Sequence, residues 1–540
     1  MTAPRLIEAM SNPDFYPHRP ERVELVQTHI SYVFIAGDYV YKVKKAVEFD
    51  FLDFTNLEKR RHFCEEELRL NRRLAPNTYL GVVEIVEDDR GNLRLGGEGR
   101  QELLPGGEGG VIDYAVRMRT LPREHMLGKI IARADFDPHV LDAIADKLAA
   151  FHRDAETGGL IDEIGGPATI RRNHEENFAE TEQYVGITIP AWQFQFIKQY
   201  IFKFIEDNMD LLDRRVKEHR IRDCHGDLHI EHIVVADEII IFDCIEFNER
   251  FRYEDVAAEV AFLAMDLDYN GYPAHGDRFV RSYTRISKDK DLIKLLNFYK
   301  CYYAYVRGKV DSFQSDEPEV DPRHREEAVN FASHYFDLAY AYAARLEDPT
   351  LILITGLMGT GKSVLAAQAA PRLGAEVIRS DVLRKEILRM APTDRHYVEF
   401  GEGIYSDDIS GKTYMAAHNR AEVLLKAGRS VIIDASYKKR DERIHAFDMA
   451  RRLGAAFLVI ECICRDEIVR ERLERRVKDQ REASDGRWEI YEAQKNDFDR
   501  IDELPRRAYL ALDTSLPTEE CVRKIIERLR SRLSCLGSSG

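Results

Sequence analysis

A run of apolar residues followed at once by a glycine-rich turn places the strongest limit on how this chain can fold. Residues 351–356 read LILITG, and residues 356–363 read GLMGTGKS. The apolar run is too continuous for a half-exposed strand and suits a parallel strand buried on both faces. The glycines allow a concave loop with inward-pointing N–H groups, and the helical pattern VLAAQAAPRLG follows. We therefore predict a phosphate-binding loop formed by Gly356, Leu357, Met358, Gly359, Thr360, Gly361, Lys362 and Ser363.

Four side chains in and near this loop have the chemistry that phosphoryl transfer requires. We expect Lys362 to contact the terminal phosphates of ATP and the Ser363 hydroxyl to hold Mg²⁺. Asp381 closes the strand pattern EVIRSD and Asp434 closes SVIID, at the sheet edge where ligands bind in α/β folds. Asp381 is assigned as the base for an acceptor hydroxyl and Asp434 as a metal ligand. A helix N-cap is the alternative role for each Asp.

Arginines near these carboxylates are candidates for stabilising the charge of the transition state. Arg384 lies one helical turn after Asp381 and is predicted to face the same acceptor. The pattern DEIVRERLERRVKDQ carries Arg472, Arg475 and Arg476. We assign Arg472 and Arg476 to the closing phosphate contacts. A solvated basic helix face is the alternative for each.

The phosphate-binding loop and the S-D-x-x-R run at 380–384 resemble one branch of the P-loop kinases over roughly residues 350–535. That branch includes gluconate kinase, chloramphenicol phosphotransferase, the zeta toxins and the 5'-kinase domain of polynucleotide kinase. The resemblance implies that Asp381 activates the acceptor hydroxyl and that Arg384 binds the acceptor. Members use different acceptors, so the resemblance does not name one. An ATPase motor is the rival interpretation.

A second phosphotransfer pattern lies upstream. His225-Gly226-Asp227-Leu228 precedes Ile241-Phe242-Asp243, in the order of a protein-kinase-like catalytic loop and metal-binding Asp about 16 residues apart. Asp227 is predicted to orient or deprotonate an acceptor hydroxyl, and Asp243 to hold Mg²⁺.

The same pattern predicts a lysine and a glutamate for the nucleotide phosphates. Lys42, in the strand pattern DYVYKV, is assigned to the phosphates and to Glu67 of the following helical segment. Lys44 lies on the same strand face and could take the place of Lys42. Glu65 and Glu66 likewise compete with Glu67.

Several segments carry a resemblance to the aminoglycoside phosphotransferase-like family over roughly residues 20–340. They are THISYVF, YKVKKAVEFDFLDF, CEEELRLNRRLAP, HGDLH and IFDCIEFNERFRYEDVAAEVAFLAMDL. The whole chain resembles bacterial fusions of such a domain with an ATP-binding domain. This resemblance does not imply antibiotic resistance.

Two positions depart from that family. Members usually have a magnesium-binding Asn five residues after the catalytic Asp, where this chain has His232. His232 takes the place of this metal ligand and is therefore a candidate for the metal site. Because imidazole suits magnesium poorly, this replacement puts catalysis by the N-terminal part in doubt. A transition-metal site of His225, His229 and His232 is a further alternative. The segment QTHISYVF also lacks the glycines of a nucleotide-covering loop.

The length of 540 residues is too great for one hydrophobic core. We predict a kinase-like N-lobe at 1–121, a helical kinase-like C-lobe at 122–346 and a P-loop kinase domain at 350–535. The fold class is thus an α+β bilobal protein-kinase-like fold followed by an α/β domain with a parallel sheet. No stretch approaches the roughly 18 apolar residues of a membrane span and the start lacks a leader pattern, so we expect a cytoplasmic protein that does not contact membranes.

These features together predict a bifunctional phosphotransferase that uses ATP and Mg²⁺ and phosphorylates an unidentified hydroxyl-bearing acceptor. One alternative is a regulatory protein whose N-terminal part is a pseudokinase that senses a nucleotide or metabolite. A nucleic-acid 5'-end kinase is a further alternative. The formal net charge of the whole chain is −16, and it is unevenly spread: the part before Leu351 carries about −19 and the part from Leu351 onward about +3. Such an acidic N-terminal part disfavours binding to nucleic acid.

Overall fold

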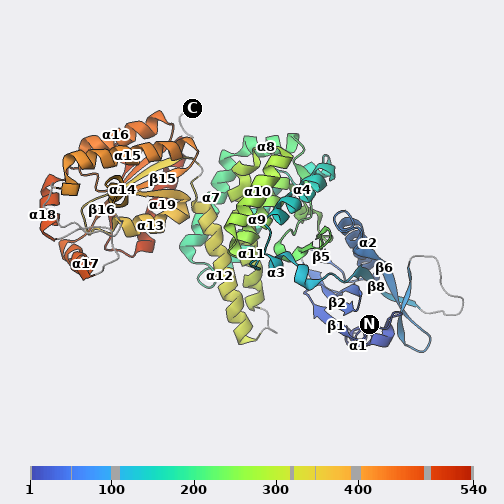
Figure 1. Cartoon of the computed structure of the whole chain (residues 1–540). Coiled ribbons are helices and arrows are strands. Elements are labelled where there is room, and N and C mark those ends of the chain that lie inside the picture. Colours follow the sequence, from blue (N-terminus) through green and yellow to red (C-terminus); the bar gives the residue numbers. More distant parts are fainter. Residues whose placement is uncertain are drawn as a thin grey trace. The chain divides into compact units, whose positions relative to one another are not determined.

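The computed structural model describes residues 3–49, 52–98, 110–316, 321–346, 348–390, 403–478 and 488–536. The chain divides into two compact units, Met1–Ala343 and Ala344–Gly540, and each is described by itself (Figure 1). Among the described helices, none combines the length and apolarity that crossing a membrane requires.

The first unit begins with an antiparallel sheet in the order β1-β2-β3-β8-β6-β7 (Figure 1). Its strands are β1 (Val23–Gln27), β2 (Ser31–Ala36), β3 (Tyr39–Lys44), β6 (Tyr79–Glu87), β7 (Leu93–Glu98) and β8 (Gly110–Arg119). Helix α1 (Ala3–Met10) covers one face, where Leu6 and Met10 pack with Phe34 and Tyr41. Helix α2 (Leu57–Asn71) packs against β6 and β8 on the other face. A short hairpin of β4 (Glu48–Phe49) and β5 (Leu52–Asp53) lies between β3 and α2.

Strand alternation explains why two lysines of β3 face helix α2. Tyr41 and Val43 enter the core beneath α1. Because neighbouring side chains of a strand point to opposite faces, Lys42 and Lys44 lie on the α2 side. Asn56 starts α2 by accepting a hydrogen bond from the Lys59 N–H.

The rest of the first unit is helical, with short strands carrying its loops. The strands are β9 (Ile221–Asp223), β10 (Ile233–Val235), β11 (Ile239–Ile241) and β12 (Tyr253–Asp255), paired β9 with β12 and β10 with β11. The helices are α3 (Leu127–Ile130), α4 (His139–Asp154), α5 (Leu160–Ile164), α6 (Pro167–Thr181), α7 (Ala191–Asp207), α8 (Met209–Lys217), α9 (Val256–Tyr269), α10 (Pro273–Ser287), α11 (Leu292–Asp316) and α12 (Pro322–Ala344). Residues Val256 to Leu267 of α9 are all buried, so this helix forms the centre of the lobe.

The second unit is an α/β domain with a parallel sheet in the order β14-β15-β13-β16-β17 (Figure 1). Its strands are β13 (Thr350–Thr355), β14 (Ala375–Arg379), β15 (Ser430–Asp434), β16 (Ala456–Ile463) and β17 (Tyr509–Asp513). Its helices are α13 (Lys362–Leu373), α14 (Ser380–Ile387), α15 (Asp407–Lys426), α16 (Arg440–Arg452), α17 (Asp466–Lys478), α18 (Trp488–Asp497) and α19 (Thr518–Leu536). Every residue of β13 is buried, as its continuous apolar sequence predicts.

Some predicted boundaries need correction. The pattern VELVQTHI at 23–30 predicts a strand that reaches residue 30, but β1 ends at Gln27. The pattern LEKRRHFCEEELRLNRRL at 57–74 predicts a helix that reaches residue 74, but α2 ends at Asn71. Asp381 was expected to close a strand, but β14 ends at Arg379 and Asp381 lies in the first turn of α14.

Candidate phosphotransfer sites

The glycine-rich loop between β13 and α13 is closely surrounded by protein. Gly356 and Gly359 have φ angles of +131° and +76°, which L side chains rarely adopt. A Cβ at Gly359 would lie 2.8 Å from Cγ1 of Val469, and one at Gly356 would lie 2.6 Å from the backbone oxygen of Cys462. The loop therefore depends on glycine for both its conformation and its close approach to β16 and α17.

Hydrogen bonds hold this loop in shape. The Thr360 hydroxyl donates to the Leu357 oxygen at 2.7 Å, and the Thr514 hydroxyl donates to the Thr360 oxygen at 2.6 Å. The Met358 N–H donates to Oε1 of Gln494 at 3.0 Å. The ammonium of Lys362 donates to the Leu357 oxygen at 2.8 Å. Lys362 is thus placed at the loop and at the N-terminus of α13, where an anion is stabilised.

Asp434 lies beside the start of α13, at the end of β15, the strand between β14 and the central strand β13. It is buried, and Nε of Arg379 is 3.6 Å from its Oδ2. Burial raises the pKa of the Asp434 carboxyl, against the opposing effects of Lys362 and a hydrogen bond with Ser363. Asp381 also acts electrostatically on Asp434, so the two predicted carboxylates share one neighbourhood. A hydroxyl and a carboxylate together form an oxygen donor set that suits Mg²⁺.

The predicted arginines occupy different surroundings. Arg384 is buried, and its Nη1 donates to the Ile404 oxygen at 3.0 Å and to the Ser410 hydroxyl at 3.1 Å. Arg472 lies at the glycine-rich loop and donates to the Thr514 oxygen at 2.8 Å. Arg472 and Arg475 line a cleft of about 350 Å³ together with Gly359, Gly361 and Thr514. The side chain of Arg476 is outside the described part.

In the first unit, the structure brings Lys42, Glu67 and Asp243 together. The Lys42 ammonium lies 2.9 Å from Oε1 of Glu67 and 2.6 Å from Oδ1 of Asp243. Burial alone would raise the pKa of Asp243, but Lys42 and His232 lower it overall. Asp243 has a φ of +65°, an uncommon conformation for a residue other than glycine. The backbone at this position is therefore strained, as is common at functional sites.

The structure also shows where the alternative residues lie: Lys44, which could replace Lys42, and Glu65 and Glu66, which could replace Glu67. Lys44 is fully buried, lies 2.8 Å from Oε2 of Glu67 and also pairs with Glu246. Glu67 thus bridges two lysines, and Asp243 is paired with Lys42. Glu65 and Glu66 instead pair with Arg61 and Arg69 on the outer face of α2.

Asp227 is half-buried between two histidines. Nε2 of His229 lies 3.7 Å from Oδ2 of Asp227, and Nδ1 of His232 lies 3.5 Å from the same oxygen. Nε2 of His232 faces Oδ2 of Asp243 at 3.6 Å. Burial alone would raise the pKa of Asp227, but the two histidines hold it well below its ordinary value. His232 therefore lies between Asp227, the predicted catalytic carboxylate, and Asp243, the predicted metal ligand.

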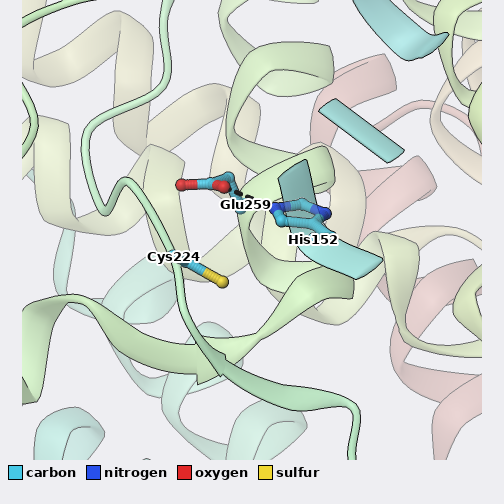
Figure 2. A group of neighbouring side chains, drawn as sticks. All are labelled: His152, Cys224 and Glu259. Carbon is cyan, nitrogen blue, oxygen red and sulfur yellow. Dashed lines mark hydrogen bonds and ion pairs between the residues drawn. The ribbon is translucent and has the colours of Figure 1, made fainter. Parts of the chain in front are cut away.

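A buried network beneath the Asp227 loop was not predicted, and Figure 2 shows its Glu259–His152 pair. Oε1 of Glu259 accepts hydrogen bonds from the N–H groups of His225 and Gly226, at 2.7 and 2.8 Å. Its Oε2 lies 2.6 Å from Nε2 of His152, whose Nδ1 lies 2.7 Å from the Tyr283 hydroxyl. One buried carboxylate thus fixes the backbone next to Asp227. The sequence signal for it is a single Glu inside the otherwise apolar segment VAAEVAFLAM at 256–265.

His225 is part of this support. Its Nε2 lies 3.0 Å from the Phe242 oxygen, and burial lowers its pKa to about 4. It therefore joins the Asp227 loop to the Asp243 segment as a neutral side chain.

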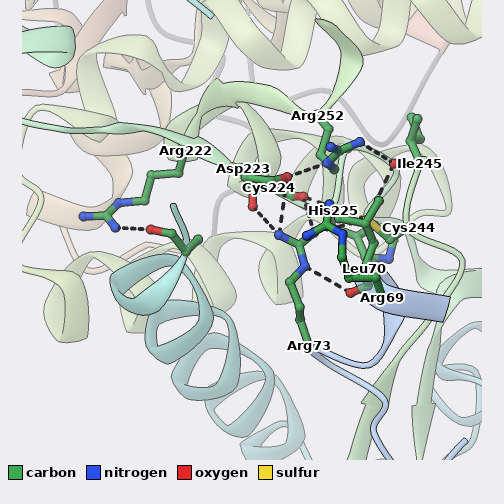
Figure 3. A network of polar contacts seen from close by, with 12 residues as sticks. Arg69, Leu70, Arg73, Arg222, Asp223, Cys224, His225, Cys244, Ile245 and Arg252 are labelled. Carbon is green, nitrogen blue, oxygen red and sulfur yellow. Dashed lines mark hydrogen bonds and ion pairs between the residues drawn. The ribbon is translucent and has the colours of Figure 1, made fainter. Parts of the chain in front are cut away.

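Residues at the end of α2 hold the same two loops from the other side (Figure 3). Arg73 donates to the backbone oxygens of Asp223 and Cys224, at 2.8 and 2.9 Å. Asn71 accepts a hydrogen bond from the Cys244 N–H at 2.9 Å and donates to the Glu67 oxygen. The helix that carries Glu67 is therefore bonded to both the start of the Asp227 loop and the Asp243 segment.

Comparison with known proteins finds family models that match two regions of the chain. The model of the phosphotransferase enzyme family matches residues 56–293, and a model described as an AAA domain matches residues 351–501. "Uncharacterized protein Rv2004c" from Mycobacterium tuberculosis and "Uncharacterized protein Mb2027c" from Mycobacterium bovis are each 30% identical over 456 residues, covering 84% of this chain and 86% of each relative.

Two solved structures are similar to parts of the chain. A gluconokinase from Sinorhizobium meliloti 1021 is 19% identical and covers 36% of this chain and 100% of its own, with a TM-score of 0.26. A choline/ethanolamine kinase family protein from Mesorhizobium loti is 12% identical and covers 63% of this chain and 99% of its own, with a TM-score of 0.36.

The family matches and the folds define a phosphotransferase domain of kinase-like fold followed by a P-loop kinase domain. This confirms the predicted fold class and the predicted family resemblance. The chain belongs to the same family as the two mycobacterial proteins.

Proposed function

We propose that the second unit transfers the γ-phosphate of ATP to the hydroxyl group of an acceptor. The observation that carries this proposal is the preformed glycine-rich loop, with Lys362 and Ser363 beside the buried Asp434 and with Asp381 in the same neighbourhood. Bound ATP and Mg²⁺ would supply the phosphoryl group and neutralise its charge.

Each residue has a distinct role in this proposal. The loop N–H groups and Lys362 bind the phosphates, and Ser363 and Asp434 hold the metal. Asp381 takes the proton of the acceptor hydroxyl, while Arg384 orients the acceptor. Arg472, which lines the cleft at Gly361, and Arg476 of the same helix close over the phosphates.

For the first unit we propose a second phosphotransfer site, with lobes at 1–121 and 122–346. Lys42 and Glu67 would bind the nucleotide, Asp243 and His232 the metal, and Asp227 the acceptor. One observation favours the alternative of a nucleotide- or metabolite-sensing pseudokinase: Asp243 is flanked by two cationic or potentially cationic groups, Lys42 and His232. These groups can balance its charge without a metal.

The test uses the full-length protein with labelled ATP, Mg²⁺ and pooled metabolites or 5'-hydroxyl oligonucleotides. Lys362→Ala and Asp381→Asn are expected to abolish transfer by the second unit. The matched controls are Lys426→Ala and Asp408→Asn, at exposed positions of α15 in the same unit. Transfer that persists in the two site variants at the level of the controls contradicts the proposal.

Transfer by the first unit is measured in the Lys362→Ala background. Remaining turnover that Asp227→Asn abolishes supports a second enzyme. Nucleotide binding without turnover in that background supports the sensor.

A further inference from the structure

The half-buried cluster of Asp227, His229 and His232 has the composition of a transition-metal site. Its three potential ligand atoms lie within 4.8 Å of one another. Two imidazoles and one carboxylate suit Mn²⁺, Co²⁺ or Zn²⁺, whereas Mg²⁺ prefers oxygen ligands. We propose that these three side chains form a binding site for a divalent transition-metal ion in the first unit.

The distances within the cluster match those between ligands of one ion. Two atoms bound at about 2.1 Å with a tetrahedral angle lie about 3.4 Å apart. Oδ2 of Asp227 is 3.7 Å from Nε2 of His229 and 3.5 Å from Nδ1 of His232. The imidazole rings of His229 and His232 have their centroids 3.8 Å apart. Small side-chain movements therefore suffice to bring the three atoms around one ion.

His232 also has the outer partner that a metal-bound histidine requires. Its Nδ1 lies 2.9 Å from the backbone carbonyl oxygen of Asp227. Because a carbonyl oxygen only accepts hydrogen bonds, Nδ1 carries the proton in the ion-free arrangement. Metal binding at Nδ1 moves that proton to Nε2, which faces Oδ2 of Asp243 at 3.6 Å. A carboxylate that accepts the second N–H of a metal-bound imidazole fixes its tautomer and orientation. Asp243 would therefore act as a positioning residue for this ion.

In a second cluster of potential metal ligands, the histidine and the carboxylate already have hydrogen-bond partners within the protein. His152, Cys224 and Glu259 are buried, but both nitrogens of His152 and both oxygens of Glu259 have hydrogen-bond partners in the protein (Figure 2). Burial also raises the pKa of the Cys224 thiol well above its ordinary value, which disfavours the thiolate form that binds metals. The ion is therefore assigned to the Asp227 cluster.

The test is titration of the full-length protein with CoCl₂, read by visible absorption and by competition with Zn²⁺. His229→Gln and His232→Asn are each expected to weaken cobalt binding by at least about tenfold, because each removes a ligand. His139→Gln is the matched control, since His139 is exposed and lies 3.0 Å from Asp142 in the same unit. This control is expected to bind cobalt as the original protein does.

Three results would contradict the inference of a metal site at Asp227, His229 and His232. Absence of a saturable cobalt site overturns it, and so does unchanged binding in both folded histidine variants, with folding checked by near-ultraviolet circular dichroism. A thiolate-to-cobalt band that Cys224→Ser removes places the ion at the other cluster and also overturns it. The inference does not rest on the proposed function, in which Asp227 faces the acceptor. ATP turnover with Mg²⁺ in the same samples tests that function separately.

Discussion

Replacement of Glu259 tests whether one buried carboxylate holds the Asp227 loop of the first unit in place. Glu259→Ala leaves the N–H groups of His225 and Gly226 and one nitrogen of His152 without their partner. Each buried unsatisfied group costs about 1–3 kcal/mol. Because water can enter the cavity and pair with some of them, we expect a loss of about 3–6 kcal/mol in the free energy of unfolding of this unit.

Glu259→Gln is the matched variant, because it keeps the shape and can keep every hydrogen bond. The amide oxygen can accept both N–H groups, and the amide nitrogen can donate to Nε2 of His152. His152 then carries its proton on Nδ1 and donates to the Tyr283 hydroxyl. Only the charge of the acceptor is lost, so we expect a cost of about 1–2 kcal/mol.

The measurement is urea unfolding of the full-length protein, together with hydrogen exchange of the peptide that contains His225 and Gly226. A chain with two compact units need not unfold in one step. The transition of the second unit is identified by Arg443→Met, which removes the buried partner of Glu503. Equal destabilisation by Ala and Gln, or unchanged exchange at His225 and Gly226 in Glu259→Ala, would refute the reasoning.

Three further predictions concern other parts of the chain. Gly359→Ala is expected to reduce ATP binding by the second unit at least tenfold in a nucleotide titration, since its Cβ would meet Val469 at 2.8 Å; unchanged affinity contradicts this. Lys44→Met is expected to destabilise the first unit by about 3–5 kcal/mol, because it leaves the carboxylates of Glu67 and Glu246 with less charge compensation. Lys42→Met should mainly weaken nucleotide binding. A larger loss of stability in Lys42→Met, or a larger loss of nucleotide affinity in Lys44→Met, contradicts this. Burial lowers the pKa of His174 from 6.5 to about 3, so the unfolded state takes up a proton in this interval that the native state does not. Stability should therefore fall by about 1.4 kcal/mol per pH unit as the pH drops from 6.5 towards 3, and His174→Phe, compared by unfolding at several pH values, should lose this part of the dependence.

The sequence predicted the parts of both sites that lie in short, ordered motifs. The glycine-rich loop is such a case, because its conformation and its flanking strand and helix are encoded within about 25 residues. Strand alternation placed Lys42 and Lys44 on one face, and Glu67 was predicted as the partner of Lys42, from which it lies 2.9 Å away. The other partners of the two lysines, Asp243 and Glu246, could not be predicted because they lie about 200 positions further along the chain.

Contacts between distant residues without a shared motif could not be predicted. Glu259 meets His152 across a separation of 107 positions and meets the catalytic loop through backbone groups, which leave no trace in residue type. Arg73 binds two backbone oxygens about 150 positions away for the same reason. The helical phase of Glu67 relative to Glu65 and Glu66 also required the packing of α2, since three consecutive glutamates give no periodic signal.

The bonds at the end of α2 limit how the first unit can be controlled. Kinase-like enzymes that are switched by movement of this helix need a state in which its glutamate leaves the lysine. Here Asn71 and Arg73 join the helix to the two loops that carry Asp243 and Asp227, so an outward swing would have to break those bonds together with the ion pairs of Glu67. An inhibitor designed to trap a swung-out helix would therefore find little of that conformation to bind. Compounds that compete for the proposed nucleotide or acceptor positions are the better starting point for blocking this unit.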